Sequence, residues 1–267
     1  MKIFLEVNET KPNAVDLRYD IVKFIKNDFN NRAEIVEDIS DCDLILTLGG
    51  DGTILRAWQQ YHHLDKLLWG INCGNLGYMT ECDTRDWKEK LSIVLEGNFK
   101  VNRYMTLQGD ICLGDKVLYH GIAMNDVVLH RVNCSVVHFN IRVDNQYLAY
   151  MNADGLVCSS PLGCTGYAIS CGGAFIDPRT EMFQLIAIAP HNLMDRSIMI
   201  SKDSEIQVQI PDERQGIVQF DGLDSNIILD SNYVLKIRKG EEYLNMVSID
   251  KGLNFVSKIA KTFTFEK

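Results

Sequence analysis

One segment, an apolar strand followed by a glycine loop and a helix, constrains this chain more than any other feature. Residues 44–48 are apolar except for Thr47, and they run directly into Gly49-Gly50-Asp51-Gly52-Thr53. The glycines let the backbone turn sharply and approach a phosphate closely, and the following helix offers unpaired N–H groups and its positive dipole end to an anion. Asp51 opposes anion binding unless it organises a metal ion or removes a proton from a hydroxyl. The loop therefore indicates phosphoryl transfer.

Composition and charge narrow the classes of protein and partner. The length of 267 residues fits two ordinary domains, and a hydrophobic fraction of 46% predicts an ample core. The net charge of −9, without any Lys/Arg-rich run, argues against nucleic acid and anionic membranes as partners. No apolar stretch approaches the roughly 18 residues of a membrane span, and no signal peptide is evident. The eight cysteines show no metal-ligand spacing, so we expect reduced thiols and a cytoplasmic location.

The first 99 residues alternate expected strands and helices. Strands are expected at residues 3–7, 33–36, 44–48 and 67–71, and helices near 12–25, from 53, and from about 84 to 96. This alternation predicts a doubly wound α/β domain with a mostly parallel sheet over residues 1–99, in which ligands bind where strands end.

Residues 100–249 have a different pattern. Short period-two segments are separated by turns such as Gly114-Asp115 and Asp144-Asn145, which predicts a β-rich domain of mainly antiparallel strands. Two inserted helices are expected, one over about residues 163–170 and one in the apolar stretch around 181–189.

Two further segments place polar residues beside apolar strands. Gly70–Tyr78 follows a buried strand, so it should lie beside the first glycine loop, where Tyr78 could stack on a base or fill a core. Asn125-Asp126 lies within an otherwise apolar strand. Because a buried, unpaired Asp costs several kcal/mol, we interpret the pair as hydrogen-bonding partners for a diol.

The segment from Asp154 to Ser170 is the richest in glycine and hydroxyl groups. An Asp-Gly pair precedes an apolar strand, and Ser159-Ser160-Pro161 then opens a helix. Hydroxyls and unpaired N–H groups at a helix start make a polar cradle. Phe220-Asp221-Gly222 is by itself only a turn signal.

In this order, these segments resemble the NAD kinases. The matching motifs are Gly-Gly-Asp-Gly, Gly-x-Asn-x-Gly-x-Leu-Gly, the Asn-Asp pair, Asp-Gly-Leu followed by Ser-x-Pro-x-Gly-x-Thr-x-Tyr, and Phe-Asp-Gly, across residues 44–222. The resemblance implies transfer of the γ-phosphoryl group of ATP, or sometimes of polyphosphate, to the 2′-hydroxyl of the adenosine ribose of NAD, which yields NADP. It also implies Mg²⁺ or another divalent cation, a homodimer or homotetramer, an NAD-binding and oligomerisation role for residues 100–249, and a tail, 250–267, that returns to the first domain.

Carried onto matching positions, the resemblance assigns roles to individual residues. Asp51 resembles the base that takes the 2′-hydroxyl proton, with organisation of Mg²⁺ as its other role. Asn125 and Asp126 resemble ligands of the nicotinamide-side ribose or amide, and Tyr167 a residue that stacks on a ring. The expected substrate-binding set is Gly50, Gly52, Thr53, Leu55, Arg56, Tyr78, Asn125, Asp126, Asn152, Asp154, Leu162, Thr165, Gly166, Tyr167, Ser170 and Asp221.

Four positions depart from the family pattern, among them Cys164 in place of a usual Ser and Gly166 in place of a common Ala, and two alternatives stay open. Asn152 replaces a usual Arg or Lys, and Leu162 a usual hydroxyl, which weakens the expected hold on the dinucleotide. A lipid or sugar kinase can share the glycine loop, but it does not explain Asn125-Asp126. A catalytically weak NAD(P)-binding sensor would not need Asp51.

Overall fold

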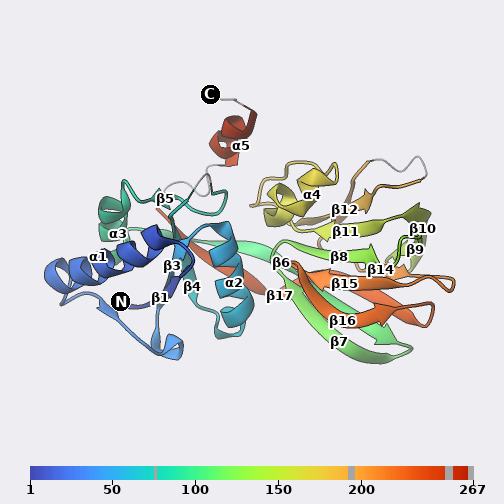
Figure 1. The fold of residues 1–267 in the computed structure, drawn as a ribbon, viewed down its shortest axis with the longest axis horizontal. Coiled ribbons are helices and arrows are strands. Elements are labelled where there is room, and N and C mark those ends of the chain that lie inside the picture. Colours follow the sequence, from blue (N-terminus) through green and yellow to red (C-terminus); the bar gives the residue numbers. More distant parts are fainter. Residues whose placement is uncertain (75–76, 192–195, 250–254, 264–267) are drawn as a thin grey trace. The chain divides into compact units, whose positions relative to one another are not determined.

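The computed structural model describes residues 1–74, 77–191, 196–249 and 255–263 (Figure 1). It divides into two compact units, one formed by the described residues of Met1–Tyr104 and Tyr243–Lys267, the other by those of Met105–Glu242. We call them unit 1 and unit 2. The chain passes between the units within two long strands, β6 (Lys100–Leu113) and β17 (Tyr233–Ser248).

Unit 1 is built on a parallel sheet in the order β2-β1-β3-β4, with β5 and the end of β17 beside β4. The elements are β1 (Lys2–Val7), α1 (Pro12–Asp28), β2 (Glu34–Ile35), η1 (Ile39–Asp41), β3 (Leu44–Gly49), α2 (Asp51–Tyr61), η2 (His62–Leu64), β4 (Leu67–Asn72), β5 (Cys82–Asp83), α3 (Trp87–Leu95) and α5 (Phe255–Phe263). Residues 250–254 and 264–267 of the expected tail lie outside the described residues.

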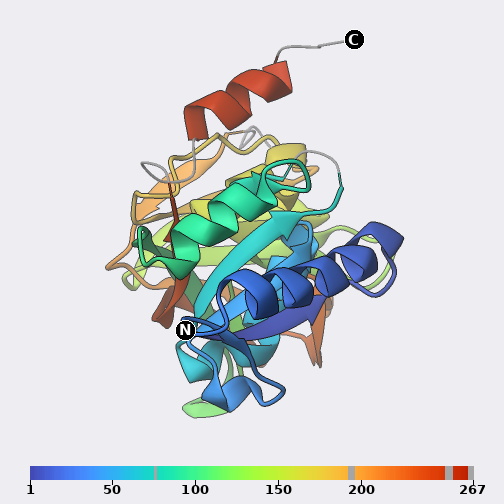
Figure 2. The same cartoon turned by 90° about the vertical axis from the view of Figure 1, so that its left-hand side faces the viewer.

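Helices cover both faces of this sheet, as the doubly wound pattern predicts. Leu44, Leu46 and Leu48 of β3 share a buried cluster with the apolar faces of α1 and α3, and Figure 2 shows these two helices in front of the sheet. On the other face, Ile54 of α2 packs against the backbone of Gly70 in β4. Every residue of β3 is buried, which explains its apolar run.

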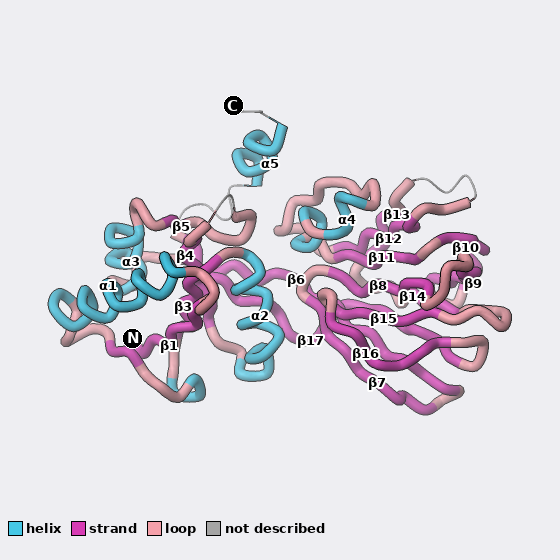
Figure 3. The backbone as a smooth tube through the Cα atoms, in the orientation of Figure 1, coloured by secondary structure: helices cyan, strands magenta, loops and turns pink. Residues whose placement is uncertain are grey.

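Unit 2 consists of two packed sheets, and strand dominates it in Figure 3. One sheet has the order β13-β12-β11-β8-β15-β16 and is wholly antiparallel, and the other joins β10, β9, β14 and β17, with β6 paired to β17 and β7. The bounds not yet given are β7 (Lys116–Ala123), β8 (Asp126–Arg131), β9 (Val137–Val143), β10 (Gln146–Ala153), β11 (Gly155–Ser159), η3 (Leu162–Thr165), α4 (Tyr167–Ser170), β12 (Met182–Ile188), β13 (Ile198–Ser201), β14 (Ile206–Gln209), β15 (Gly216–Phe220) and β16 (Leu223–Leu229).

The core of unit 2 lies between its two sheets, and period-two alternation supplies its side chains. Phe139 of β9 and Phe183 of β12 are fully buried in it. Gly109 and Gly121, which pair across β6 and β7, leave room for the ring of Phe220. The ring therefore anchors the end of β15, immediately before Asp221.

Two helix predictions in this half require correction. The apolar stretch around residues 181–189 is not a helix but strand β12, which pairs with β11 and β13. The helix expected over 163–170 is a 3₁₀ helix, η3, and one short α-helical turn, α4, separated at Gly166. Gly166 has φ −87° and ψ −131°, which interrupts the helical hydrogen bonding.

Among the described residues, none of the helices combines the length and apolarity that a membrane crossing demands.

Candidate active site

The two glycine segments of unit 1 meet at the carboxyl edge of its sheet, as the sequence predicts for neighbouring parallel strands. Gly49 at the end of β3 is the register partner of Asn72 at the end of β4. The N–H of Cys73 donates to the carbonyl oxygen of Gly49 at 2.6 Å. Helix α2 begins at Asp51, two residues earlier than expected, so this carboxylate belongs to the first helical turn.

Asp51 is held by the segment that follows β4. Its Oδ2 accepts the N–H of Tyr78 at 2.7 Å, and its Oδ1 accepts the N–H of Met79 at 3.0 Å. The side chain is half-buried, and each carboxylate oxygen keeps a lone pair for a further partner. The structure therefore fixes the orientation of a carboxylate that can still accept a proton.

Glycines permit this close arrangement at Gly49 and Gly77. A Cβ at Gly49 would lie 2.0 Å from the hydroxyl oxygen of Thr53, and one at Gly77 would lie 3.1 Å from Oδ1 of Asp51. At Gly52, by contrast, a Cβ would meet nothing within 4 Å. The fold itself does not require glycine at this exposed position.

A basic pocket of about 320 Å³ lies over the start of α2. Lys11 and Arg56 line it together with Gly50, Gly52 and Thr53. The pocket combines two cations with a helix N-terminus, which suits a phosphate chain. Sequence reasoning missed Lys11, and also Asn8 and Thr10 of the same pocket.

Three other residues of unit 1 that we expected in the site, Thr53, Tyr78 and Leu55, differ in their burial and contacts. Thr53 is buried, and its hydroxyl oxygen accepts the N–H of Gly50 at 3.4 Å. Tyr78 is half-buried and contributes its backbone N–H to Asp51. Leu55 lies half-buried on α2 and is not part of the basic pocket.

In unit 2, Asp221 organises the Asn125-Asp126 pair. Its carboxylate accepts three consecutive backbone N–H groups, those of Met124 and Asn125 at 2.7 Å each and that of Asp126 at 3.0 Å. Asp221 has the left-handed φ of +51°, which Asp adopts more readily than most residues. The apparent turn signal is therefore the support of the neighbouring pair.

Ser160, which follows β11, also forms hydrogen bonds with the backbone at this pair. The N–H of Ser160 donates to the carbonyl oxygen of Asn125 at 2.8 Å, and its hydroxyl donates to that of Met124 at 2.7 Å. A Cβ at Gly163 would lie 2.2 Å from the backbone carbonyl oxygen of Asn125, so only glycine fits there.

Asp126 is the most perturbed carboxyl group of this pocket. It is buried, with 6% of its surface exposed. Burial, and secondarily the charge of Asp221, raises the pKa of Asp126 to about 7. Among the described residues, the buried side-chain oxygen of Asn125 has no hydrogen-bond donor. The pair thus offers a ligand one carboxyl group that titrates near neutrality and one unsatisfied acceptor.

We expect the Asp126→Asn variant to gain stability over the natural protein as the pH rises from 5 to 8. Across this window the folded protein retains a proton that the unfolded chain has released, so folding stability falls with rising pH until Asp126 is ionised. Between pH 5 and pH 8, the free energy of unfolding of the variant should rise relative to that of the natural protein by about 2 kcal/mol. Urea unfolding at each pH measures this difference. Asp115→Asn, in the exposed Gly114-Asp115 turn, is the control; equal pH profiles for both variants would contradict the prediction.

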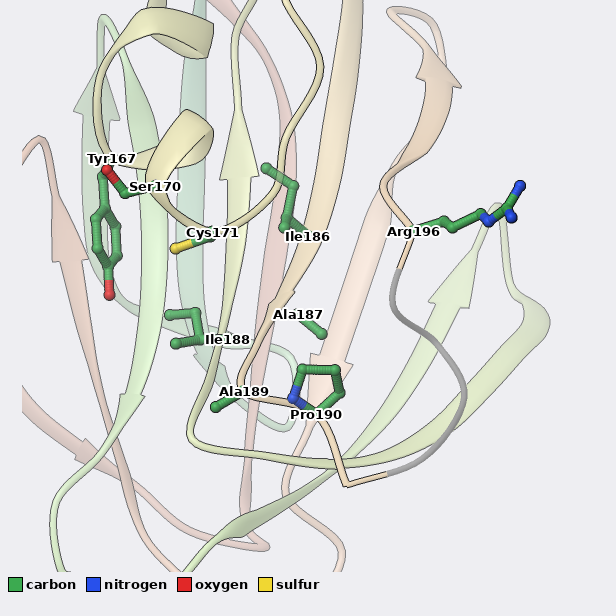
Figure 4. A pocket seen from close by; sticks show the side chains of 9 residues that line it. All are labelled: Tyr167, Ser170, Cys171, Ile186, Ala187, Ile188, Ala189, Pro190 and Arg196. Carbon is green, nitrogen blue, oxygen red and sulfur yellow. The ribbon is translucent and has the colours of Figure 1, made fainter.

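Two pockets flank Tyr167. One, of about 420 Å³, is lined by Asn125, Asp126, His130, Asp221 and others. The second, of about 400 Å³, is shown in Figure 4. There Cys171 lies between Tyr167 and Ile186 of β12, while Arg196 extends away from the other labelled side chains. Sequence reasoning missed the lining residues Val128, His130, Gln219, Gly222, Cys171, Ile186, Ala187, Ile188, Ala189, Pro190 and Arg196.

Five other expected residues of unit 2 are not among the residues that line these two pockets. A Cβ at Gly166 would lie within 4.0 Å of the side chains of Asn125 and Asp126. Asp154 forms an ion pair with Arg131 at 3.3 Å. Among the described residues, the buried side-chain oxygen of Asn152 has no donor. Leu162 is buried, and Thr165 is half-buried at the end of η3.

The described residues contain no group of three or more His, Cys, Asp or Glu side chains that could hold a metal ion. Mg²⁺ usually binds one or two carboxylates together with substrate phosphates and water. A lone carboxylate beside a phosphate pocket is compatible with that mode.

Comparisons of both halves of the chain with known proteins find NAD kinases. A model of the ATP-NAD kinase N-terminal domain matches residues 4–99, and one of the ATP-NAD kinase C-terminal domain matches residues 124–249. An NAD kinase of Lachnospira eligens is 31% identical over 229 residues, which cover 85% of this chain and 76% of that protein. An NAD kinase of Buchnera aphidicola subsp. Acyrthosiphon pisum is 30% identical over 95% of this chain and 87% of its own length.

Solved structures show the same likeness. An NAD kinase from Archaeoglobus fulgidus, in complex with ATP, has a TM-score of 0.78 and 25% identity, covering 97% of this chain and 99% of that one. A yeast NADH kinase complexed with NADH shares the fold, with a TM-score of 0.88, 19% identity, and coverage of 100% of this chain and 88% of its own.

A fixed carboxylate beside a basic helix start suits an enzyme that phosphorylates a hydroxyl group, and this geometry fits the class of nucleotide-dependent phosphotransferases. Within that class, the chain belongs to the NAD kinase family. The resemblance carried by the five sequence motifs is thereby confirmed, and so is the activity it implies, ATP-dependent phosphorylation of NAD to NADP.

Proposed function

We propose that this chain transfers the γ-phosphoryl group of ATP to the 2′-hydroxyl of the adenosine ribose of NAD, with Asp51 as the general base. The observation that carries the proposal is the fixed Asp51 carboxylate, held by two backbone N–H groups beside the basic pocket of unit 1. A positioned base takes the hydroxyl proton as the oxygen attacks phosphorus. The protein otherwise orients the two nucleotides and neutralises charge.

The charges of the pockets support a division of labour. Lys11 and Arg56 give the unit 1 pocket positive charge, which favours phosphate groups. Asp126 and Asp221 give the unit 2 pocket acidic character, which favours ribose hydroxyls, an amide or a cationic ring. We therefore assign phosphate binding to unit 1 and dinucleotide binding to unit 2, with Tyr167 stacking on a ring.

Mg²⁺ or another divalent cation is part of the proposal. Asp51 and the ATP phosphates would hold the ion, which would supply neutralisation of charge on the transferred group. The lone Asp51 carboxylate beside the basic pocket supports this role, since no second acidic group is required when phosphates complete the coordination.

The experiment that tests the proposal uses purified protein with ATP, Mg²⁺ and NAD, followed by NADP-specific detection. We expect NADP that carries the phosphate on the 2′-oxygen, which phosphorus NMR of the product identifies. Phosphorylation at any other hydroxyl would contradict the proposed acceptor. Parallel reactions with polyphosphate and with NADH define the donor and the redox form that the enzyme prefers.

Gly52→Ala is expected to raise stability while lowering activity. A Cβ here meets no protein atom within 4 Å, and alanine in place of glycine stabilises a helix by about 0.5–1 kcal/mol. The same methyl group would obstruct close approach of a phosphate, so we expect KM for ATP to rise several-fold. Thermal unfolding and steady-state kinetics measure the two effects. An unchanged KM would indicate that phosphates do not approach this position.

We further propose a cytoplasmic location and a homodimer or homotetramer. The eight free cysteines support a reducing compartment. Tyr147 and Tyr150 are 62% and 43% exposed on β10, the last strand of its sheet, and exposed aromatic side chains favour self-association. Sedimentation analysis measures the oligomeric state, and a monomer at micromolar concentration would contradict the second proposal.

A further inference from the structure

The short segment that holds Asp51 is itself held from the carboxyl-terminal helix. Tyr78 and Met79 donate their backbone N–H groups to the Asp51 carboxylate. On the other side of the same segment, the Nζ of Lys258 in α5 donates to the carbonyl oxygens of Tyr78 and Thr80, at 2.5 and 2.9 Å. Both interactions lie within unit 1, although the lysine is 180 residues from Tyr78.

One peptide group connects the lysine to the carboxylate. The carbonyl of Tyr78 and the N–H of Met79 belong to the same peptide bond, so the ammonium group binds its oxygen while Asp51 binds its hydrogen. A cation on the oxygen polarises the amide and strengthens the N–H as a donor. Lys258 thus acts on Asp51 both by fixing the peptide plane and by polarising the bond that reaches the carboxylate.

A second set of contacts anchors the following residue without reaching Asp51. The Glu81 carboxylate accepts the hydroxyl of Ser248 at 2.6 Å and the N–H of Ile249 at 3.0 Å. The Nζ of Lys90 donates to the carbonyl oxygen of Glu81 at 2.5 Å. Lys90 therefore binds the same segment as Lys258. The carbonyl group that Lys90 binds, that of Glu81, belongs to a different peptide group from the one that contacts Asp51. A Lys90 variant is therefore a matched control for a Lys258 variant.

We propose that Lys258 is a positioning residue for the reaction, which acts through the Tyr78–Met79 peptide group to orient and polarise the contact to Asp51. This inference rests on the proposed role of Asp51 as the base. It assigns a part in catalysis to a helix that contains none of the sequence motifs. The lysine touches no reacting atom in this proposal, and its effect should appear in kcat rather than in the KM values.

The test compares Lys258→Met, Lys258→Arg and Lys90→Met in the full-length enzyme. A hydrogen bond to a charged group corresponds to roughly a tenfold effect, so we expect Lys258→Met to lower kcat by about tenfold with both KM values unchanged. Lys258→Arg, which keeps the cation, should recover most of the activity. Lys90→Met should lower the melting temperature and leave kcat within about twofold. Equal loss of kcat in both methionine variants would overturn the proposal, because it would indicate general loosening of the segment.

A double-mutant cycle separates this inference from the proposed function. If Lys258 acts through Asp51, the methionine substitution should have no further effect on kcat in an Asp51→Asn background. Independent, multiplicative losses would overturn the inference. Failure of the natural enzyme to form NADP in the same assay would instead contradict the proposed function. Val256→Ala, at a position 76% exposed on α5, is the control for the helix itself.

Discussion

Replacement of Asp51 by asparagine is expected to lower the turnover number by a factor of about 10² to 10⁴, the usual contribution of a positioned general base. The amide keeps the shape of the carboxylate but cannot take a proton from the acceptor hydroxyl. Its oxygen can still accept one of the two N–H groups that lie 2.7 and 3.0 Å from the carboxylate. Because Asp51 is half-buried, we expect the fold and the affinity for NAD to be retained. Initial rates of NADP formation and calorimetric NAD binding measure the two quantities.

The control for this variant is Asp16→Asn, an exposed position on α1, which should leave turnover unchanged. A titration with Mg²⁺ distinguishes the two roles considered for Asp51. If Asp51 mainly organises the ion, high Mg²⁺ should restore much of the lost activity, whereas loss of a base is not restored by metal. Near-normal turnover of Asp51→Asn at ordinary Mg²⁺ would exclude both roles.

The α/β half of the fold was predictable because its signals are local. Ala14, Leu17, Ile21 and Ile25 recur at three- and four-residue steps, and all four are buried on α1. The continuous apolar run of β3 is buried throughout. In each case the pattern of apolar residues in a short segment matches the faces on which that segment is buried: one face for α1 and both faces for β3.

The segment around residues 181–189 was wrongly predicted as a helix because a short apolar run has no diagnostic period. Phe183, Leu185 and Ile186 are buried in β12, which has a strand partner on each side. Burial on both faces removes the alternation that identifies a strand. Tertiary pairing, which the local sequence does not encode, decided the structure.

The candidate site was predictable only in part, for a related reason. The edge of a parallel sheet gathers the residues that follow each strand, so Asp51 and the segment after β4 could be placed together from the sequence. Lys11 follows β1 at that edge and could have been found by the same argument. The roles of Asp221 and Lys258 could not, since their contacts join residues about 95 to 180 positions apart. Neither residue carries a local signal for the backbone groups that it binds.

The second large effect is expected at Asp221. Asp221→Ala removes the acceptor of three consecutive backbone N–H groups, those of Met124, Asn125 and Asp126. It also places alanine at a φ of +51°, a conformation that disfavours alanine more than Asp or Asn. We expect the free energy of unfolding to fall by about 2–4 kcal/mol. NAD affinity should fall at least tenfold, because the Asn125-Asp126 pair loses its support. Urea unfolding and NAD calorimetry measure these changes.

Asp221→Asn separates the geometric role of this residue from its charge. Asparagine tolerates the left-handed backbone and keeps one acceptor, so its stability should lie between those of the alanine variant and the natural protein. It also removes the charge that, after burial, raises the pKa of Asp126. The fall of stability with rising pH should therefore end at a lower pH and be smaller in this variant. Asp224→Asn, an exposed neighbour that accepts from Gln219 at 2.6 Å, should change stability by less than about 0.5 kcal/mol. An Asp221→Ala variant as stable as the Asp224 control would show that the three N–H groups find other partners, and that the pair does not depend on Asp221.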